Sequence, residues 1–311
     1  MSDRLDVTKT YKLYIGGAFP RSESGRTLPV GRAPGGPVAH VSRASRKDLR
    51  DAVEAAARAQ PAWAEATAYN RGQVLYRMAE MLEGKKAEFA GLLGSPALRA
   101  GSSGTPRSKA RGTRKPAAER RATQETAREV EAAIDRLVCF GGWADKYAQV
   151  LGCNNPVAGP FYNFTVPEPT GIVGVIAPDA PALLGLVSLI APPLCAGNAV
   201  VALGSETSPL VAAVFAEVCA TSDVPPGVLN ILTGLREELV PHFSSHREIN
   251  AIHAAGVSPA HARALREGAA DNVKRVTVRE GVDWFDEGAC HSPWWIEGFV
   301  EMKTMWHPSG A

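Results

Sequence analysis

The feature that most constrains the fold is an alternation of short apolar runs and helical patterns over residues 171–278. The apolar runs, which we predict to be strands, span residues 171–177, 198–203, 227–232, 249–252 and 273–278. The helical patterns between them cover residues 183–195, 209–220, 236–245 and 259–268. Such alternation is typical of βαβ units, and continuously apolar strands favour burial on both faces of a parallel sheet. The pattern therefore predicts an α/β fold with a doubly wound, five-stranded parallel sheet.

The ends of these predicted strands carry the residues best placed to bind a ligand. In an open parallel sheet, ligands bind outside the carboxyl ends of the strands. Those ends here carry Pro178 with Asp179, Ser205 with Glu206, and Gly256. No Gly-x-Gly-x-x-Gly fingerprint follows the first predicted strand. The usual dinucleotide-binding motif therefore does not identify the ligand.

The chain before this alternation predicts short strands and long helices. Extended pieces fall within residues 11–41, and a helix begins near Ser45 and is interrupted at Pro61. Ser45 and Asp48 have the spacing of a capping box. Further helices are predicted over residues 70–93 and 118–147, followed by a strand-like stretch over residues 161–166.

Residues 94–118 differ from the rest of the chain. They contain no acidic residue, few apolar ones and six basic ones: Arg99, Arg107, Lys109, Arg111, Arg114 and Lys115. Such a segment cannot bury enough surface to offset the entropy lost on ordering, so we predict a disordered linker. A nucleic-acid-binding arm is the less favoured alternative, because no aromatic residues are interleaved for base stacking.

Charge and hydropathy exclude several classes of function. The chain has 34 basic and 32 acidic residues, a balance that argues against a nucleic-acid-binding surface. Its longest apolar stretch is broken by Pro192, Pro193 and Gly197, so we expect no membrane-spanning helix. The first ten residues lack the apolar core of a secretory signal, so we expect a cytoplasmic protein. The five cysteines are widely spaced, which favours reduced, buried thiols over disulfides or a zinc site: Cys139, Cys153, Cys195, Cys219 and Cys290.

Several motifs occur together in a fixed order. They are Tyr-Ile-Gly-Gly at 14–17, Gly-Ile-Val-Gly-Val-Ile-Ala-Pro at 171–178, Ala-Gly-Asn at 196–198, Pro-Gly-Val-Leu-Asn at 226–230 and Lys-Arg-Val-Thr at 274–277. This ordered set resembles the aldehyde dehydrogenase superfamily over most of the chain outside residues 94–118. The resemblance implies an NAD(P)-binding sheet without the glycine fingerprint. It also implies that residues 299–306 form an oligomerisation strand.

The residues that the family uses for chemistry are replaced here. The family oxidises aldehydes with a cysteine nucleophile, an asparagine that holds the oxyanion, a glutamate base and NAD(P) as hydride acceptor. Where the family has Pro-Trp-Asn, this chain has Pro178, Asp179 and Ala180. At the position of the base stands Arg279, with Glu280 one residue further on. The only late cysteine, Cys290, lacks the family's surrounding motif, and we expect the catalytic lobe to be missing before the chain ends at Ala311. We therefore assign no catalytic residue.

The resemblance still implies a cofactor cleft, although a weakened one. The residues that match the family's cofactor positions are Ile176, Pro178, Ser205, Glu206 and Gly256. Leu203 replaces the lysine that contacts the adenosine ribose in the family, so we expect NAD or NADP to bind weakly or not at all. The implied organisation is an N-terminal part of the cofactor domain over 1–93, the linker over 94–118, a Rossmann-like domain over 119–280 with an oligomerisation hairpin near 150–169, and a tail over 281–311.

These features are closest to the cysteine-less second unit of tandem-domain aldehyde dehydrogenases. We therefore predict a catalytically inactive subunit that pairs with a full-length aldehyde dehydrogenase subunit or forms a homo-oligomer. Two alternatives stay open, an active NAD(P)-dependent aldehyde oxidoreductase that uses Cys290, and a decaying gene remnant without function.

Two further clusters carry weaker signals. His242 and His246 have the i, i+4 spacing of helical metal ligands, but no third ligand is evident, so we interpret them as surface residues. Four tryptophans near the carboxyl end predict either a partner-facing patch or packing of the tail: Trp284, Trp294, Trp295 and Trp306.

Overall fold

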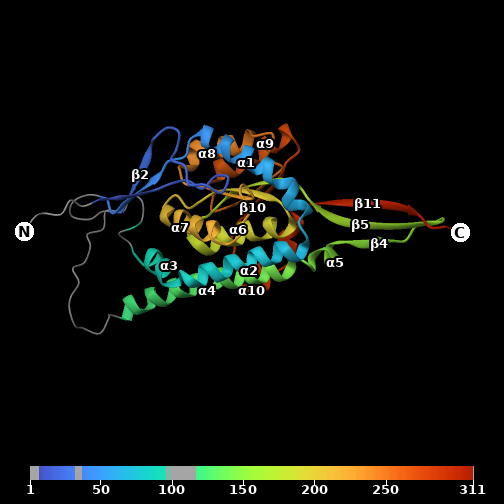
Figure 1. The fold of residues 1–311 in the computed structure, drawn as a ribbon, viewed down its shortest axis with the longest axis horizontal. Coiled ribbons are helices and arrows are strands. Elements are labelled where there is room, and N and C mark those ends of the chain that lie inside the picture. The colour runs from blue at the N-terminus through green and yellow to red at the C-terminus, as the bar shows by residue number, and fades with distance from the viewer. Residues whose placement is uncertain (1–6, 32–36, 96–97, 99–116, 311) are drawn as a thin grey trace, which may run out of the picture.

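The computed structural model describes residues 7–31, 37–95, 98 and 117–310 (Figure 1). Most of the basic segment 94–118 therefore lies outside the described residues, and its disorder stays a prediction. Among the described helices, no segment combines the length and the hydropathy that crossing a bilayer requires.

A five-stranded parallel sheet forms the centre of the molecule, as the sequence predicted. Its strands, in spatial order, are β10 (Arg275–Arg279), β9 (Ala251–Ala255), β6 (Ile172–Ile176), β7 (Ala199–Leu203) and β8 (Leu229–Leu232). In the register of this sheet, Val173 of β6 is opposite Val200 of β7 and Ala251 of β9. Every residue of β6, β7, β8 and β9 is buried, which explains why their sequences are mainly apolar, with Asn230 and His253 as the polar exceptions.

Helices cover both faces of this sheet (Figure 1). One face is covered by α1 (Arg46–Glu65), α8 (Arg236–Ser245) and α9 (Pro259–Gly268), whose apolar side chains form a core with Ile176, Val201 and Ile252. The other face is covered by α6 (Ala182–Ala196) and α7 (Pro209–Ala220), with α2 (Ala68–Gly84) and α4 (Ala117–Trp143) outside them. The sheet is therefore doubly wound.

The structure corrects two predicted helix boundaries. The first helix is not interrupted at Pro61, because α1 continues to Glu65. Pro61 has no N–H to donate to the carbonyl of Ala57, but both residues lie on the exposed side of the helix. Trp63 holds the last turn in place, because its Nε1 donates to Leu194 O at 3.1 Å. The helix predicted over 70–93 is two helices, α2 and α3 (Lys86–Leu93). Lys85 separates them and pairs with Glu217 of α7 at 2.8 Å.

Two smaller sheets complete the strand framework. Near the amino end, β1 (Lys9–Tyr11), β3 (Ala39–Ser42) and β2 (Thr27–Val30) form one sheet. The other sheet, which we call the arm, consists of β11 (Val300–Pro308), β5 (Phe161–Pro169) and β4 (Cys153–Asn155), and follows the short helix α5 (Tyr147–Leu151). The arm extends away from the body (Figure 1), and β11 pairs with β5 in antiparallel register from Val300 opposite Pro169 to Pro308 opposite Phe161.

The segment between β10 and β11 packs back onto the body. It contains the 4-residue helices α10 (Glu287–Cys290) and α11 (Trp294–Glu297), while a 3₁₀ turn (Ala269–Asp271) precedes β10. Trp284 and Trp295 are buried there with ring centroids 6.1 Å apart, whereas Trp294 and Trp306 are exposed. The four tryptophans thus divide between core packing and the surface.

Candidate functional site

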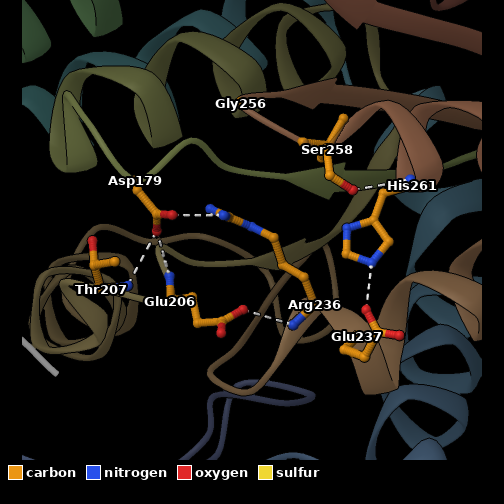
Figure 2. A pocket seen from close by; sticks show the side chains of 9 residues that line it. Asp179, Glu206, Thr207, Arg236, Glu237, Gly256, Ser258 and His261 are labelled. Carbon is orange, nitrogen blue, oxygen red and sulfur yellow. Dashed lines mark hydrogen bonds and ion pairs between the residues drawn. The ribbon is translucent and has the colours of Figure 1, made fainter. Parts of the chain in front are cut away.

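A cavity of about 460 Å³ lies at the carboxyl ends of the central strands. This is where an open parallel sheet binds its ligands. The loops and helix starts that follow β6, β7, β8 and β9 supply the lining: Asp179, Glu206, Thr207, Arg236, Glu237, Gly256, Val257, Ser258 and His261 (Figure 2).

Asp179 joins the loops after β6 and β7. Its Oδ1 accepts hydrogen bonds from the backbone N–H of Glu206 at 2.9 Å and of Thr207 at 3.1 Å. The Ser205 hydroxyl donates to the same oxygen at 3.0 Å and accepts from Ser208 N–H at the start of α7. The side chain that replaces the family's tryptophan therefore fixes the loop that follows the neighbouring strand.

Arg236, the first residue of α8, reaches across the cavity to Asp179 (Figure 2). One terminal nitrogen is 2.6 Å from Asp179 Oδ2, and the other donates to Ala177 O at 2.8 Å. Arg236 is only 8% exposed, and its Nε has no partner among the described residues. Burial raises the pKa of Asp179, but the hydrogen bond and charge of Arg236, with the Thr207 N–H and the Ser205 hydroxyl, outweigh it and lower the pKa below its ordinary value.

Glu206 and Glu237 bring further negative charge to the cavity. Glu206 Oε2 accepts the backbone N–H of Arg236 at 2.9 Å, a favourable place for a carboxylate because α8 begins there. Glu237 Oε2 is 3.1 Å from His261 Nε2. Arg236 is already paired with Asp179. Among the described residues, the lining therefore offers no second guanidinium to Glu206 and Glu237.

The opposite wall follows β9. Gly256 has a φ of +63°, and a Cβ at this position would come within 2.9 Å of Pro178 Cβ, so glycine suits both the backbone and the space. Ser258 Oγ caps α9 by accepting the His261 N–H at 3.2 Å, and Pro259, the first residue of this helix, has no N–H. The amino end of α9 therefore has few donors left for an anionic ligand.

The five sequence-predicted cofactor residues are placed differently from one another. Glu206 and Gly256 line the cavity, and Pro178 packs directly against Gly256. Ile176 is fully buried in the core below the cavity. Ser205 is 2% exposed, and its hydroxyl is used by Asp179 and Ser208.

Sequence reasoning missed Arg236, Thr207, Glu237 and Ser258. It placed Asp179 at a strand end without foreseeing its pairing with Arg236. The available signal was the position of Arg236, which follows the end of the predicted strand 227–232 by four residues. A cation at the carboxyl end of a parallel strand is a candidate ligand-binding or pairing group.

The position that the resemblance assigns to the catalytic base holds a half-buried cation. Arg279 donates from Nε to His253 Nε2 at 2.8 Å, and its guanidinium carbon lies 3.7 Å from the centre of the Trp295 ring. Burial lowers the pKa of Arg279 to about 10. Glu280, the next residue, is on the surface and pairs with Arg266 at 3.3 Å. Neither side chain lines the cavity.

The cysteines lie away from the cavity. Cys195, Cys219 and Cys290 are buried, Cys139 is half-buried, and Cys153 is exposed on β4. Burial raises the pKa of the Cys290 thiol although Arg136 opposes it, and Cys290 Sγ lies 3.4 Å from Asp283 O. Among the described residues, the lining of the cavity contains no cysteine.

His242 and His246 line a separate surface depression with three arginines, Arg46, Arg50 and Arg247. Burial lowers the pKa of His242, and the charge of Arg46 lowers it further. In the described part of the chain, no group of three His, Cys, Asp or Glu side chains is close enough to hold a metal ion.

The doubly wound sheet, the cavity at its carboxyl edge and the antiparallel arm define the class of the fold, an open α/β domain with a ligand-type cavity. Residues 21–283 match the aldehyde dehydrogenase family, and the chain belongs to that family. Human retinal dehydrogenase 2 is 32% identical to it over 286 residues, which are 89% of this chain and 49% of that protein. Cytosolic aldehyde dehydrogenase 1 of Elephantulus edwardii is 30% identical over 275 residues, 87% of this chain and 50% of that protein.

Solved structures give the same result. PnpE from Pseudomonas sp. WBC-3 superposes with a TM-score of 0.74 at 28% identity and covers 88% of this chain and 51% of its own. A complex of PnpE with nicotinamide adenine dinucleotide superposes with a TM-score of 0.73 at 28% identity, covering 87% and 51%. The chain thus spans about half the length of these relatives.

Proposed function

We propose that this chain is a non-catalytic subunit of the aldehyde dehydrogenase family, which pairs through its arm with a complete aldehyde dehydrogenase subunit. The observation that carries the proposal is Arg279. It stands at the position of the family's base and is held between His253 and Trp295. An arginine stays protonated at neutral pH and cannot remove a proton from water.

The thiols support the same proposal. Aldehyde oxidation in this family begins with attack by a thiolate, and burial that raises the pKa of a thiol makes it less reactive. Burial raises the pKa of Cys290, the one cysteine that sequence reasoning could place in this role. Ala180, at the position of the family's asparagine, has no side-chain donor for an oxyanion.

The charges that line the cavity disfavour NAD and NADP. A dinucleotide brings a pyrophosphate with two negative charges to a lining that holds Asp179, Glu206 and Glu237. Among the described residues, Arg236 is the only guanidinium in the lining, and it is already paired with Asp179. We therefore expect thermal-shift titrations with NAD and NADP to give small or no increases in Tm, because only binding to the native state raises it.

The arm supplies the surface for pairing. Both outer strands, β11 and β4, have an edge without a neighbouring strand among the described residues, and such edges can pair with another sheet. Large apolar side chains are exposed along β5 and β11: Phe161, Tyr162, Met302, Met305 and Trp306. A solvated surface of this kind is costly unless a partner covers it.

Co-purification with a tagged complete aldehyde dehydrogenase subunit tests the proposal. Trp306→Glu on the arm is compared with Trp294→Glu on α11, because these two tryptophans are 60% and 58% exposed. We expect the first change to abolish the complex and the second to leave it intact. A chain that stays monomeric beside a complete subunit, or two variants with equal effects, would contradict pairing through the arm.

A further inference from the structure

A depression of about 200 Å³ lies where the first turns of α1 meet the last turn of α8, two helices that are side by side (Figure 1). We call it the basic depression. It is smaller than the roughly 300–1,000 Å³ of pockets that hold drug-sized ligands. Among the described residues, its lining has three guanidinium groups, two imidazoles and no carboxylate: Arg46, Leu49, Arg50, His242, Ser245, His246 and Arg247.

The charges along the two helices change from paired to unpaired toward the basic depression. At the start of α8, Glu238 pairs with Arg43 and Arg26. One turn further along, the same face of α8 carries His242, which lies near Arg46. Like charges that gather without a counter-charge are destabilising, and departures from good local pairing concentrate at functional sites. The unpaired charge therefore marks the basic depression as a candidate binding site.

Two of the three guanidinium groups are open to solvent. Arg46 and Arg247 are exposed, and neither side chain has a hydrogen-bond or ion-pair partner among the described residues. Arg50 pairs with Asp51 and Glu54 of its own helix, each at 3.4 Å. Arginine holds phosphate through several parallel N–H bonds. Arg46 and Arg247 are thus available to a ligand that offers several phosphate oxygens.

The carboxyl end of α8 does not repel an anion here. The last carbonyls of a helix carry partial negative charge unless a cation or donor satisfies them. Lys274 Nζ donates to Ser244 O at 2.6 Å, to His246 O at 2.8 Å and to Phe243 O at 3.4 Å. Its buried ammonium group neutralises these carbonyls and adds positive charge near His246.

We propose that the basic depression is a binding site for linked phosphate groups, as in a diphosphate, held by the side chains of Arg46, Arg50, His242, His246 and Arg247. Linked phosphates suit it better than a single phosphate, because its cationic positions recur one helical turn apart on each of the two helices. The basic depression shares no residue with the cavity at the carboxyl ends of the strands. The inference goes beyond the proposed function, since it concerns neither the arm nor aldehyde chemistry.

Calorimetric titration with inorganic pyrophosphate tests the proposal, with chloride at matched ionic strength as the reference. The unmutated chain should bind pyrophosphate saturably. Arg46→Gln combined with Arg247→Gln should weaken binding by about tenfold or more, because lost charge-assisted hydrogen bonds have at least that effect. ADP should bind no more tightly than pyrophosphate, since the described lining has no Phe, Tyr or Trp on which a base could stack. No saturable binding, or tighter binding of ADP, would overturn the proposal.

Arg58→Gln combined with Arg21→Gln is the matched control. Both arginines are exposed and have no hydrogen-bond or ion-pair partner among the described residues, but neither lines the basic depression. This control removes the same charge as Arg46→Gln with Arg247→Gln, and it should leave the affinity within about twofold because salt screens distant charges. Equal losses in the two double variants would overturn the proposal, since net charge alone would then explain binding. A DNA duplex that binds while pyrophosphate does not would assign the surface to nucleic acid and would also overturn it.

The histidines give a second readout. Burial lowers the pKa of His242 and of His246, and the charge of Arg46 lowers that of His242 further. The charged groups near His246 have opposing effects on its pKa: Glu248 and Glu54 raise it, and Lys274 lowers it. A bound dianion favours the protonated form of both rings, and by reciprocity protonation favours the dianion.

Sulfate measures this linkage, because it keeps both of its charges between pH 6 and pH 8. The unmutated chain should bind sulfate more tightly at about pH 6 than at about pH 8. His242→Gln combined with His246→Gln should lose this difference while it still binds at pH 8. A pH dependence that is unchanged in this variant would overturn the assignment of the histidines to the site. Co-purification through the arm does not involve these residues, so the two proposals can fail separately.

Discussion

Asp179 accepts hydrogen bonds from the loop after β7 and from Arg236 at the start of α8, and its ionisation should therefore matter for stability. The pKa of this carboxyl is lowered in the folded chain, mainly by Arg236 acting against burial. A depressed folded pKa adds stability that is present above the unfolded value of about 3.9 and is lost as the pH falls through the folded value. We expect Asp179→Asn to reduce the free energy of unfolding at pH 7 by about 1–3 kcal/mol and to flatten its dependence on pH below 4.

Urea unfolding at several pH values measures this effect. Glu237→Gln serves as the reference, because its carboxylate is largely exposed and should change stability by less than about 0.5 kcal/mol. Parallel acid profiles for Asp179→Asn and the unmutated chain would show that the Asp179–Arg236 pair contributes nothing to acid sensitivity.

The cysteines should differ sharply in reactivity. Cys153 is exposed on β4, whereas Cys195, Cys219 and Cys290 are buried and burial raises the pKa of each of the three. Since one pKa unit changes the thiolate fraction about tenfold, we expect one fast thiol in the native chain and the buried thiols to react at least tenfold more slowly. Labelling with an aromatic disulfide reagent measures this. Cys153→Ser should remove the fast phase, and labelling of Cys290 as fast as Cys153 would show that Cys290 is accessible.

Glu206 and Gly256 could be placed at the cavity from sequence, because each lies within four residues of the end of a predicted strand and strand ends meet at one edge of the sheet. Arg236 could not. It begins α8, and the local pattern gives only a helix start, not the direction of a long side chain that turns back to Asp179. The role of Asp179 depends on the same long-range contact.

At the scale of elements, α1 gives a prediction about helix capping. Ser45 Oγ accepts from the N–H groups of Lys47 and Asp48, and Asp48 Oδ2 accepts the Ser45 N–H at 2.7 Å. Ser45→Ala should lower the free energy of unfolding by about 1 kcal/mol, measured by urea unfolding. Ser245→Ala, which removes only a bond to Pro241 O at the end of α8, should cost less than about 0.5 kcal/mol. Equal effects would mean that the capping box adds no stability.

The elements also show where local patterns reach their limit. The fourth strand was predicted over 249–252, but β9 spans Ala251–Ala255. His253 is a polar residue that interrupts the apolar run, so the sequence pattern ends too early. Its fully buried ring is accommodated by contacts with Leu189 O and Arg279 Nε. In α1, burial of Trp63 against α6 overrides the local signal of Pro61. In each case a contact distant in sequence decides the boundary.

At the scale of the whole molecule, the body and the arm have separate roles in the proposed function. The body has a packed core on both faces of its sheet and a cavity whose charged groups are paired with one another. The arm carries five of the exposed large apolar side chains, and its two outer strands have edges without a neighbouring strand in the described part of the chain. A non-catalytic subunit needs this division, because its partner supplies the chemistry and its own surface supplies the pairing.

Aldehyde-dependent formation of NADH or NADPH by the purified chain alone tests whether it is an enzyme. Arg279 cannot act as a base, and the buried Cys290 thiol cannot act as a ready nucleophile. We therefore predict no reduced cofactor above the level of a protein-free control, for short and long aldehydes alike. Turnover by the unmutated chain that disappears in Cys290→Ala would contradict the proposed function.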